Sequence, residues 1–170
     1  TPTTAAVNAP SLPQAAGSSL PALPNTSAAP VNAALPAGIE LSSQTVEIVT
    51  DIYRLTVDLK GASIVRAELL TYPLEKKAGS ANVLLLDTAP ADFFVAQSGW
   101  LTKSGQNAPT HEAMFQTADG KTAYALADGQ ASLAVPFVWT DAASGVRLTK
   151  TLVLSRGSFT IKQVQELQNT

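Results

Sequence analysis

Apolar and polar residues alternate along most of the chain after residue 40, and this alternation constrains the fold more than any other feature. Between residues 52 and 59 the apolar side chains occupy every second position, with polar side chains between them. Successive side chains of a β-strand point to opposite faces, so this period predicts a strand with one buried face. Gly61 then marks a turn, and residues 64–70 resume the pattern. The sequence therefore predicts an early β-hairpin.

The same alternation of apolar and polar residues continues to the end of the chain. Pro136, inside one of the runs, indicates a sheet edge or an irregularity, because proline cannot donate to a strand ladder. Asp119 and Gly120 form a hairpin turn signal, and broken alternation at Gln163 and Val164 suggests a β-bulge. The extended runs lie at residues 82–87, 92–97, 113–117, 122–127, 133–139, 146–154 and from 159 onward. Short strands separated by glycine and aspartate turns, without a helical period, predict an all-β fold, an antiparallel β-sandwich.

Residues 1–39 have a different composition. They contain seven of the eleven prolines, no aromatic residue and no charged residue. Such a segment buries too little apolar surface to offset its ordering entropy, so we expect a disordered Pro/Ala/Ser-rich linker. As a flexible coil it would span roughly 35 Å. A ligand for SH3-like domains is the alternative, but no basic residue flanks its prolines. The predicted organisation is a linker at 1–39 and one domain at 40–170, within a longer protein.

Charge and cysteine content exclude several classes of function. The formal net charge is −2, and only 14% of the residues are charged. Without a basic cluster the chain lacks the electrostatic pattern that binds nucleic acid or an anionic membrane surface. The absence of cysteine excludes a disulfide framework and a thiolate metal site. No run of 18 apolar residues is long enough to span a bilayer.

No arrangement of residues predicts catalysis, a metal or a cofactor. The single histidine, His111, lies in a polar stretch, and we expect it and Glu112 to point apart. A catalytic or zinc site needs several such groups within reach of one another. The aspartates that stand beside turns are expected to bind backbone amides. They are Asp87, Asp92, Asp119, Asp128 and Asp141. The sequence therefore predicts a protein that is not an enzyme.

The aromatic residues are expected mostly in the core, where each ring can bury about 150–250 Å². They include Phe93, Phe94, Tyr124, Phe137, Trp139 and Phe159. Trp100 differs, because it follows Ser98 and Gly99 and precedes a polar loop that we expect over residues 99–109. Trp100 is either a loop anchor in the core or a residue at the rim of a cleft that binds a polypeptide segment. It is the candidate interaction residue.

Several short signatures resemble one known family. The segment from Thr50 reads TDIYRLTVDLKGASIVRAELLTYPLEK, and AQSG, ADGQ and TDAA follow at residues 96–99, 127–130 and 140–143. A KTxVLxRG stretch runs from Lys150 to Gly157. Together they resemble the large periplasmic domain of the YidC family of bacterial membrane protein insertases, over approximately residues 44–169. These are turn and strand signatures, so they indicate a fold and a family rather than reacting groups.

The resemblance implies a β-supersandwich related to mutarotase folds; either this chain carries its first part, or a smaller sandwich closes within these residues. It implies a place in the periplasm, within a Gram-negative inner-membrane protein. It also implies contacts with Sec translocon accessory subunits and with nascent membrane proteins. The family's membrane groove for substrates has no counterpart in these residues. Two alternatives stay open: a carbohydrate-binding sandwich, although a lone histidine does not fit a mutarotase site, and a structural spacer.

Overall fold

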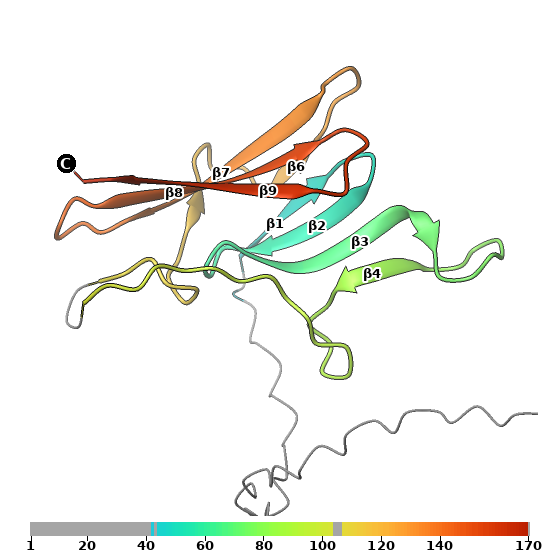
Figure 1. Ribbon diagram of the computed structural model, residues 1–170, viewed down its shortest axis with the longest axis horizontal. Coiled ribbons are helices and arrows are strands. Elements are labelled where there is room, and N and C mark those ends of the chain that lie inside the picture. The colour runs from blue at the N-terminus through green and yellow to red at the C-terminus, as the bar shows by residue number, and fades with distance from the viewer. Residues whose placement is uncertain (1–41, 43, 104–106, 170) are drawn as a thin grey trace, which may run out of the picture. The chain divides into compact units, whose positions relative to one another are not determined.

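The alternating segments form nine strands in the part of the chain that the structure describes (Figure 1). This computed structural model describes residue 42, residues 44–103 and residues 107–169. The linker predicted at residues 1–39 lies outside them. The bounds are β1 Thr45–Val49, β2 Tyr53–Asp58, β3 Ser63–Pro73, β4 Asn82–Leu86, β5 Gln116–Thr117, β6 Ala123–Ala125, β7 Ser132–Thr140, β8 Arg147–Ser155 and β9 Ile161–Gln168. The strands lie in two sheets, and the predicted all-β sandwich is confirmed.

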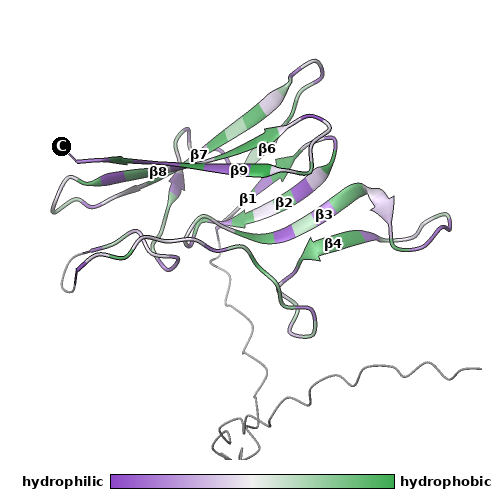
Figure 2. Ribbon diagram, viewed as in Figure 1, coloured by the Kyte–Doolittle hydropathy of each residue, from purple (hydrophilic) through white to green (hydrophobic). Residues whose placement is uncertain are grey.

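The first sheet has the strand order β4-β3-β2-β1-β6 and contains the predicted hairpin. Strands β2 and β3 pair antiparallel, with Tyr53 opposite Leu69, and the turn between them holds Gly61 at a φ of 72°. Figure 2 shows polar and apolar residues alternating along β2. Asp58 departs from the pattern, because it is buried although its position predicts the solvent face. Its carboxylate accepts hydrogen bonds from the amides of Ser42 and Lys60, both at 2.8 Å.

The second sheet has the order β5-β7-β8-β9. Strands β8 and β9 pair without a break in register, from Leu154 opposite Ile161 to Arg147 opposite Gln168. The β-bulge suggested near Gln163 is therefore wrong. Regular alternation is lost there because β9 carries polar side chains on both faces.

Pro136 lies inside β7 without disturbing its pairing with β8. Its carbonyl oxygen accepts a hydrogen bond from the amide of Ala118, which follows the last residue of β5. The amide position of a strand residue faces the same side as its carbonyl, so Pro136 faces the short strand β5. The missing amide hydrogen therefore falls where β5 has already ended, which agrees with the expected edge position.

The turn at Asp119 and Gly120 does not close a hairpin, and this expectation is wrong. Strand β5 pairs antiparallel with β7, whereas β6 pairs parallel with β1 in the other sheet. The turn thus transfers the chain from one sheet to the other. The run at residues 92–97 forms no strand; Phe94 and Ala96 make isolated bridges to Asp87 and Ile64.

The inner faces of the two sheets meet in one apolar core. The first sheet contributes Val46, Ile48 and Leu55, and the second contributes Val135, Phe137 and Leu148, all with no exposed surface. The core expectation is wrong for Phe94 and Phe159, which are 67% and 51% exposed. Phe159 instead lies edge-on against Tyr72, with their ring centres 5.7 Å apart.

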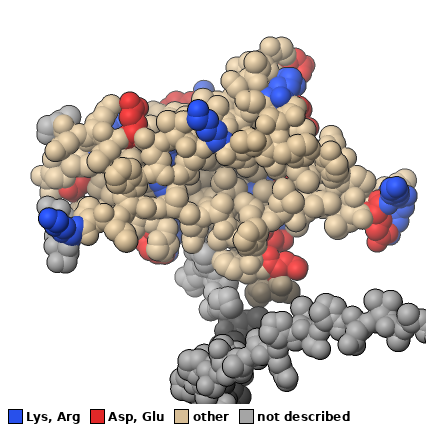
Figure 3. Space-filling model, in the orientation of Figure 1, with Lys and Arg blue, Asp and Glu red and all other residues tan. Residues whose placement is uncertain are grey.

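Charged side chains are scattered over a mostly uncharged surface on the face shown in Figure 3. No basic cluster appears on that face, in keeping with the low charge content. Among the described residues there is also no helix long and apolar enough to cross a membrane.

Candidate functional site

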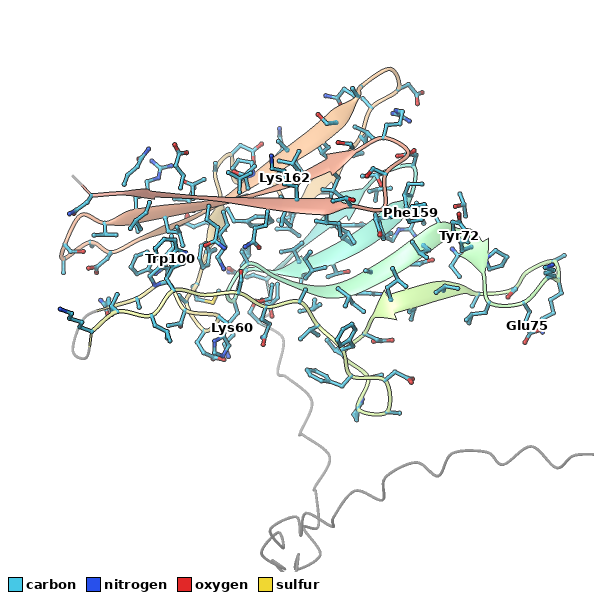
Figure 4. The ribbon with its side chains drawn as sticks, viewed as in Figure 1. Lys60, Tyr72, Glu75, Trp100, Phe159 and Lys162 are labelled. Carbon is cyan, nitrogen blue, oxygen red and sulfur yellow. The ribbon has the colours of Figure 1, made fainter. Side chains whose placement is uncertain are left out.

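The inner face of the second sheet has two different coverings. Residues that are paired in register form rows of side chains across β7, β8 and β9. In one such row, Leu148 of β8 lies between Trp139 of β7 and Leu167 of β9. Over β9 the loop that carries Trp100 takes the place of the first sheet. We call residues 98–103 and 107–110 the Trp100 loop. Figure 4 shows Trp100 on the loop side of β9, while Lys162 lies on the opposite side of that strand.

Two side-chain contacts hold the Trp100 loop on β9. The Trp100 indole N–H donates to Oε1 of Gln165, and Nε2 of Gln163 donates to Oγ of Ser98 at 3.0 Å. The Trp100 amide also donates to the carbonyl of Pro109 at 3.0 Å, which closes the loop on itself. The loop position expected for Trp100 agrees with the structure. Trp100 is 41% exposed, so this residue is neither part of the core nor free in solvent.

A cleft of about 430 Å³ opens between the Trp100 loop and the end of the second sheet. Its apolar surface comes from the loop and from the inner face of β7 and β9, and its polar surface from the β7–β8 turn and the loop. Lining residues include Trp100, Asn107, Pro109, Trp139, Asp141 and Leu167. We call this space the Trp100 cleft. Two tryptophans and a leucine beside a polar rim are suited to an amphipathic ligand.

Asp141 is the single charged residue among the described residues that line the cleft. Hydrogen bonds from the Ser144 hydroxyl and from the Asn107 amide hold the pKa of the Asp141 carboxyl below its ordinary value. The Asn107 bond is 3.1 Å long and connects the Trp100 loop to the β7–β8 turn. The carboxylate also accepts the Ser144 amide at 3.2 Å, which is the turn-binding role expected for it. The rim therefore stays negatively charged at neutral pH.

Lys150 is the residue that the sequence argument missed. Its side chain lies on the inner face of β8 and is only 1% exposed. The ammonium donates to the carbonyl oxygens of Gly61 and Ser98 at 2.8 and 2.6 Å, and it lies 3.2 Å from Oγ of Ser98. Burial lowers the pKa of Lys150 to about 8. The alternation of apolar and polar residues could have revealed that Lys150 is buried, because position 150 falls on the same face as Leu148 and Leu152.

Ser98 and Lys150 are the residue types of a serine–lysine nucleophile pair. A lysine acts as general base through a free lone pair on a neutral amine. Here the pKa of about 8 keeps Nζ mostly protonated at neutral pH, and its hydrogens are directed to three oxygens. The geometry therefore suits an anchor for the Trp100 loop rather than a base.

The other titratable candidates are not gathered into a site. His111 and Glu112 do not point apart as expected; Nε2 of His111 lies 3.3 Å from the Glu112 carboxylate, and Lys60 pairs with the same carboxylate. Both residues lie in a turn rather than a strand, which brings their side chains to one side. A hydrogen bond from Lys60 lowers the pKa of Glu112. Lys60 and Glu112 thus form an ion pair at the surface, and His111 lies beside it.

Two further turn aspartates bind backbone amides, as expected. Asp87 accepts the amide of Thr88 at 2.7 Å, and Asp119 accepts the amide of Lys121 at 3.3 Å. Within the described ranges, no three histidine, aspartate or glutamate side chains are placed to hold a metal ion.

Comparison with known proteins assigns the family. Residues 45–170 match the family described as the YidC periplasmic domain. The chain is 36% identical over 150 residues to the membrane protein insertase YidC of Methylococcus capsulatus, covering 88% of this chain and 27% of that protein. It is 36% identical over 176 residues to the Stenotrophomonas maltophilia insertase, covering 100% and 30%. It is 37% identical over 138 residues to the Aeromonas salmonicida insertase, covering 78% of this chain and 24% of that protein.

The chain thus spans less than a third of the length of these relatives. The matched region coincides with the nine strands and with both sheets. The chain therefore belongs to the YidC periplasmic domain family, and the periplasm is its compartment.

Proposed function

We propose that this chain is a non-catalytic accessory domain of a membrane protein insertase, and that its Trp100 cleft holds an extended polypeptide segment. The segment would come from a nascent membrane protein or from an accessory subunit of the Sec translocon. The observation that carries this proposal is the cleft itself, which is lined by the exposed side chains of Trp100 and Leu167 and by the half-buried Trp139, beside a polar rim. Proteins named as membrane protein insertases are its relatives, which supports this choice of ligand.

The dimensions of the cleft favour a segment over a folded partner. A volume of about 430 Å³ is within the usual range for sites that take a few side chains or a small molecule. An extended segment presents alternate side chains to one surface, so apolar residues can enter the cleft while the backbone stays at the rim. Asn107 and Ser144 supply polar groups at that rim. Aromatic residues contribute strongly to such contacts, because they bury a large area with little loss of side-chain entropy.

The non-catalytic role is supported by the state of the titratable groups. Lys150 is bound through its ammonium to the backbone, and His111 pairs with Glu112 at the surface. The Asp141 carboxylate is occupied by the turn that it stabilises.

One observation also favours the carbohydrate alternative. Tryptophans beside aspartate and asparagine are a composition that binds sugars, because rings stack on the sugar face while the polar groups bind its hydroxyls. The cleft has this composition in Trp100, Trp139, Asn107 and Asp141. The same titration therefore has to include sugars.

Fluorescence anisotropy tests the proposal on the 170-residue chain. The probe is a fluorescein-labelled decapeptide in which leucine alternates with serine, and a panel of hexoses and N-acetylhexosamine oligomers competes with it. We expect saturable probe binding that Trp100→Ala weakens by at least about tenfold and that Lys162→Ala leaves unchanged. Competition by sugars would identify the cleft as a carbohydrate-binding site instead. Equal binding by the wild type and Trp100→Ala would remove the cleft as the site.

A further inference from the structure

Lys150 occupies a position that the strand pattern reserves for an apolar residue. It lies between Leu148 and Leu152 on the inner face of β8, and both leucines are almost fully buried. None of the ion pairs in the described part of the chain involves Lys150. A buried ammonium without a carboxylate has to be stabilised by dipoles, and losing any of them is costly. The identities of its acceptors therefore matter.

The acceptors belong to two segments that are far from β8 in the sequence. Gly61 lies in the turn between β2 and β3, and Ser98 begins the Trp100 loop; they are 89 and 52 residues from Lys150. The ring of Phe115 lies beneath the ammonium, with 4.8 Å between Nζ and the ring centre, which adds a cation–π contact. One side chain of the second sheet thus binds a turn of the first sheet and the loop that forms the cleft.

The backbone around these acceptors is packed too closely to be displaced easily. A Cβ at Gly61 would lie 2.3 Å from the carbonyl oxygen of His111, and a Cβ at Gly99 would lie 2.6 Å from its amide nitrogen. The turn, the start of the loop and the His111 backbone therefore form one dense layer over the ammonium. Trp100 follows this layer directly, two residues after Ser98.

We infer that Lys150 is a positioning residue for the Trp100 cleft: its ammonium binds the Ser98 and Gly61 carbonyls and thereby fixes the Trp100 indole over β9. The importance of the cleft for ligands rests on the proposed function, whereas the anchoring itself does not. Burial lowers the pKa of Lys150 to about 8, so the ammonium keeps its donors at neutral pH. Gln163 also binds the Ser98 side chain, and Gln165 accepts the hydrogen bond of the Trp100 indole.

The first test uses Lys150→Met, which keeps an unbranched side chain only one atom shorter and removes its charge. Hydrogen exchange is followed by mass spectrometry on the 170-residue chain, with Lys162→Met on the outer side of β9 as the matched control. We expect at least about tenfold faster exchange of the hydrogen-bonded amides of this region, which are those of Trp100, Thr110, Glu112 and Ala113. Exchange in β7 and β8 should be unchanged. The affinity for the leucine–serine decapeptide should fall by at least about tenfold.

The second test restores the charge chemically. The chain contains no cysteine, so Lys150→Cys can be alkylated selectively in denaturant and refolded. Bromoethylamine gives a side chain with an ammonium at nearly the lysine position, and bromoethanol gives a neutral side chain of similar size. The aminoethyl form should show the slow exchange and the affinity of the wild type, and the hydroxyethyl form should behave as Lys150→Met. This comparison also decides the case if Lys150→Met does not fold.

The two proposals fail in different ways. If the wild type does not bind the probe, the proposed function fails, and the exchange data alone decide whether Lys150 anchors the loop. If the wild type binds the probe and Lys150→Met binds it equally well, the positioning role is overturned. Equal exchange in the aminoethyl and hydroxyethyl forms would overturn it as well.

Discussion

Leu148 and Leu167 are partners in register on the same face of the second sheet, yet Leu148 has no exposed surface and Leu167 is 48% exposed. The difference shows where the core ends. Leu148 packs in the apolar core, whereas Leu167 lines the Trp100 cleft. The cleft is therefore an extension of the core face that the first sheet does not cover.

Alanine substitutions at these partners should separate stability from binding. Leu148→Ala leaves a cavity in a closely packed core, and we expect it to lower the free energy of unfolding by about 2–5 kcal/mol. Leu167→Ala removes a half-exposed side chain and should cost less than about 1 kcal/mol. Urea denaturation measures both changes. In the anisotropy titration, Leu167→Ala should weaken probe binding although the protein remains folded. Equal stability losses for the two variants would contradict the conclusion that the core ends between Leu148 and Leu167.

Gly61 and Gly129 provide a matched pair for the packing around Lys150. Both have a left-handed backbone, with φ values of 72° and 79°. A Cβ at Gly129 meets open space, whereas one at Gly61 lies 2.3 Å from the His111 carbonyl oxygen. Gly129→Ala should cost about 1–2 kcal/mol from backbone strain. Gly61→Ala should cost at least about 1–3 kcal/mol more, since backbone must move. Similar midpoints in urea for the two variants would show that the layer is not closely packed.

The stability of the fold should depend on the protonation of Lys150. Its folded pKa of about 8 lies below the ordinary value of 10.5, so the unfolded chain binds more protons between these values. The free energy of unfolding should therefore rise as the pH increases through this window, by on the order of 3 kcal/mol. Below pH 8 this contribution should be constant.

Lys150→Met supplies the reference for this titration, because every other ionisable group, including the exposed cluster of His111, Glu112 and Lys60, is common to both proteins. Urea denaturation is measured at pH values below, within and above the window. The difference between wild type and variant should change in the wild type's favour as the pH increases. A pH-independent difference would mean that the Lys150 pKa is not lowered by burial.

The rim of the cleft can be tested through Asp141. Ser144→Ala removes the hydroxyl that lowers the pKa of Asp141 most, so it should raise this pKa most. Asn107→Ala removes the second strongest hydrogen bond and should raise the pKa less. The carboxyl resonance of Asp141, followed by NMR against pH, reports both shifts. Because the lowered pKa reflects bonds to the ionised form, these contacts should weaken as the pH falls through that pKa. An unchanged pKa in Asn107→Ala would show that the loop and the turn are not joined there.

The sequence could predict the elements that a period of two describes directly. Strands β2, β3, β7 and β8 were predicted in this way, because alternation reports which residues face the core. It could not assign β5 and β6 to different sheets, since Asp119 and Gly120 indicate a turn but not the partner of the next strand. Register between distant strands is a tertiary property that local pattern does not contain.

Only part of the candidate site could be predicted from the sequence. Trp100 could be recognised as a loop residue, but its partner Gln165 is 65 residues away, and nothing local connects them. Lys150 was detectable in principle, as a charge on an otherwise apolar strand face. Its two shortest hydrogen bonds go to backbone carbonyls, which carry no sequence signature at all.

Photo-crosslinking in cells tests the central claim most directly. A photoreactive amino acid replaces Trp100 or, as the control, Lys162 in a full-length insertase that contains this domain, and mass spectrometry identifies the products. We predict crosslinks from position 100 to nascent membrane proteins or to translocon accessory subunits, and far fewer from position 162. Absence of these partners at position 100, or equal yields at both positions, would contradict the assignment of the Trp100 cleft as a polypeptide-binding site.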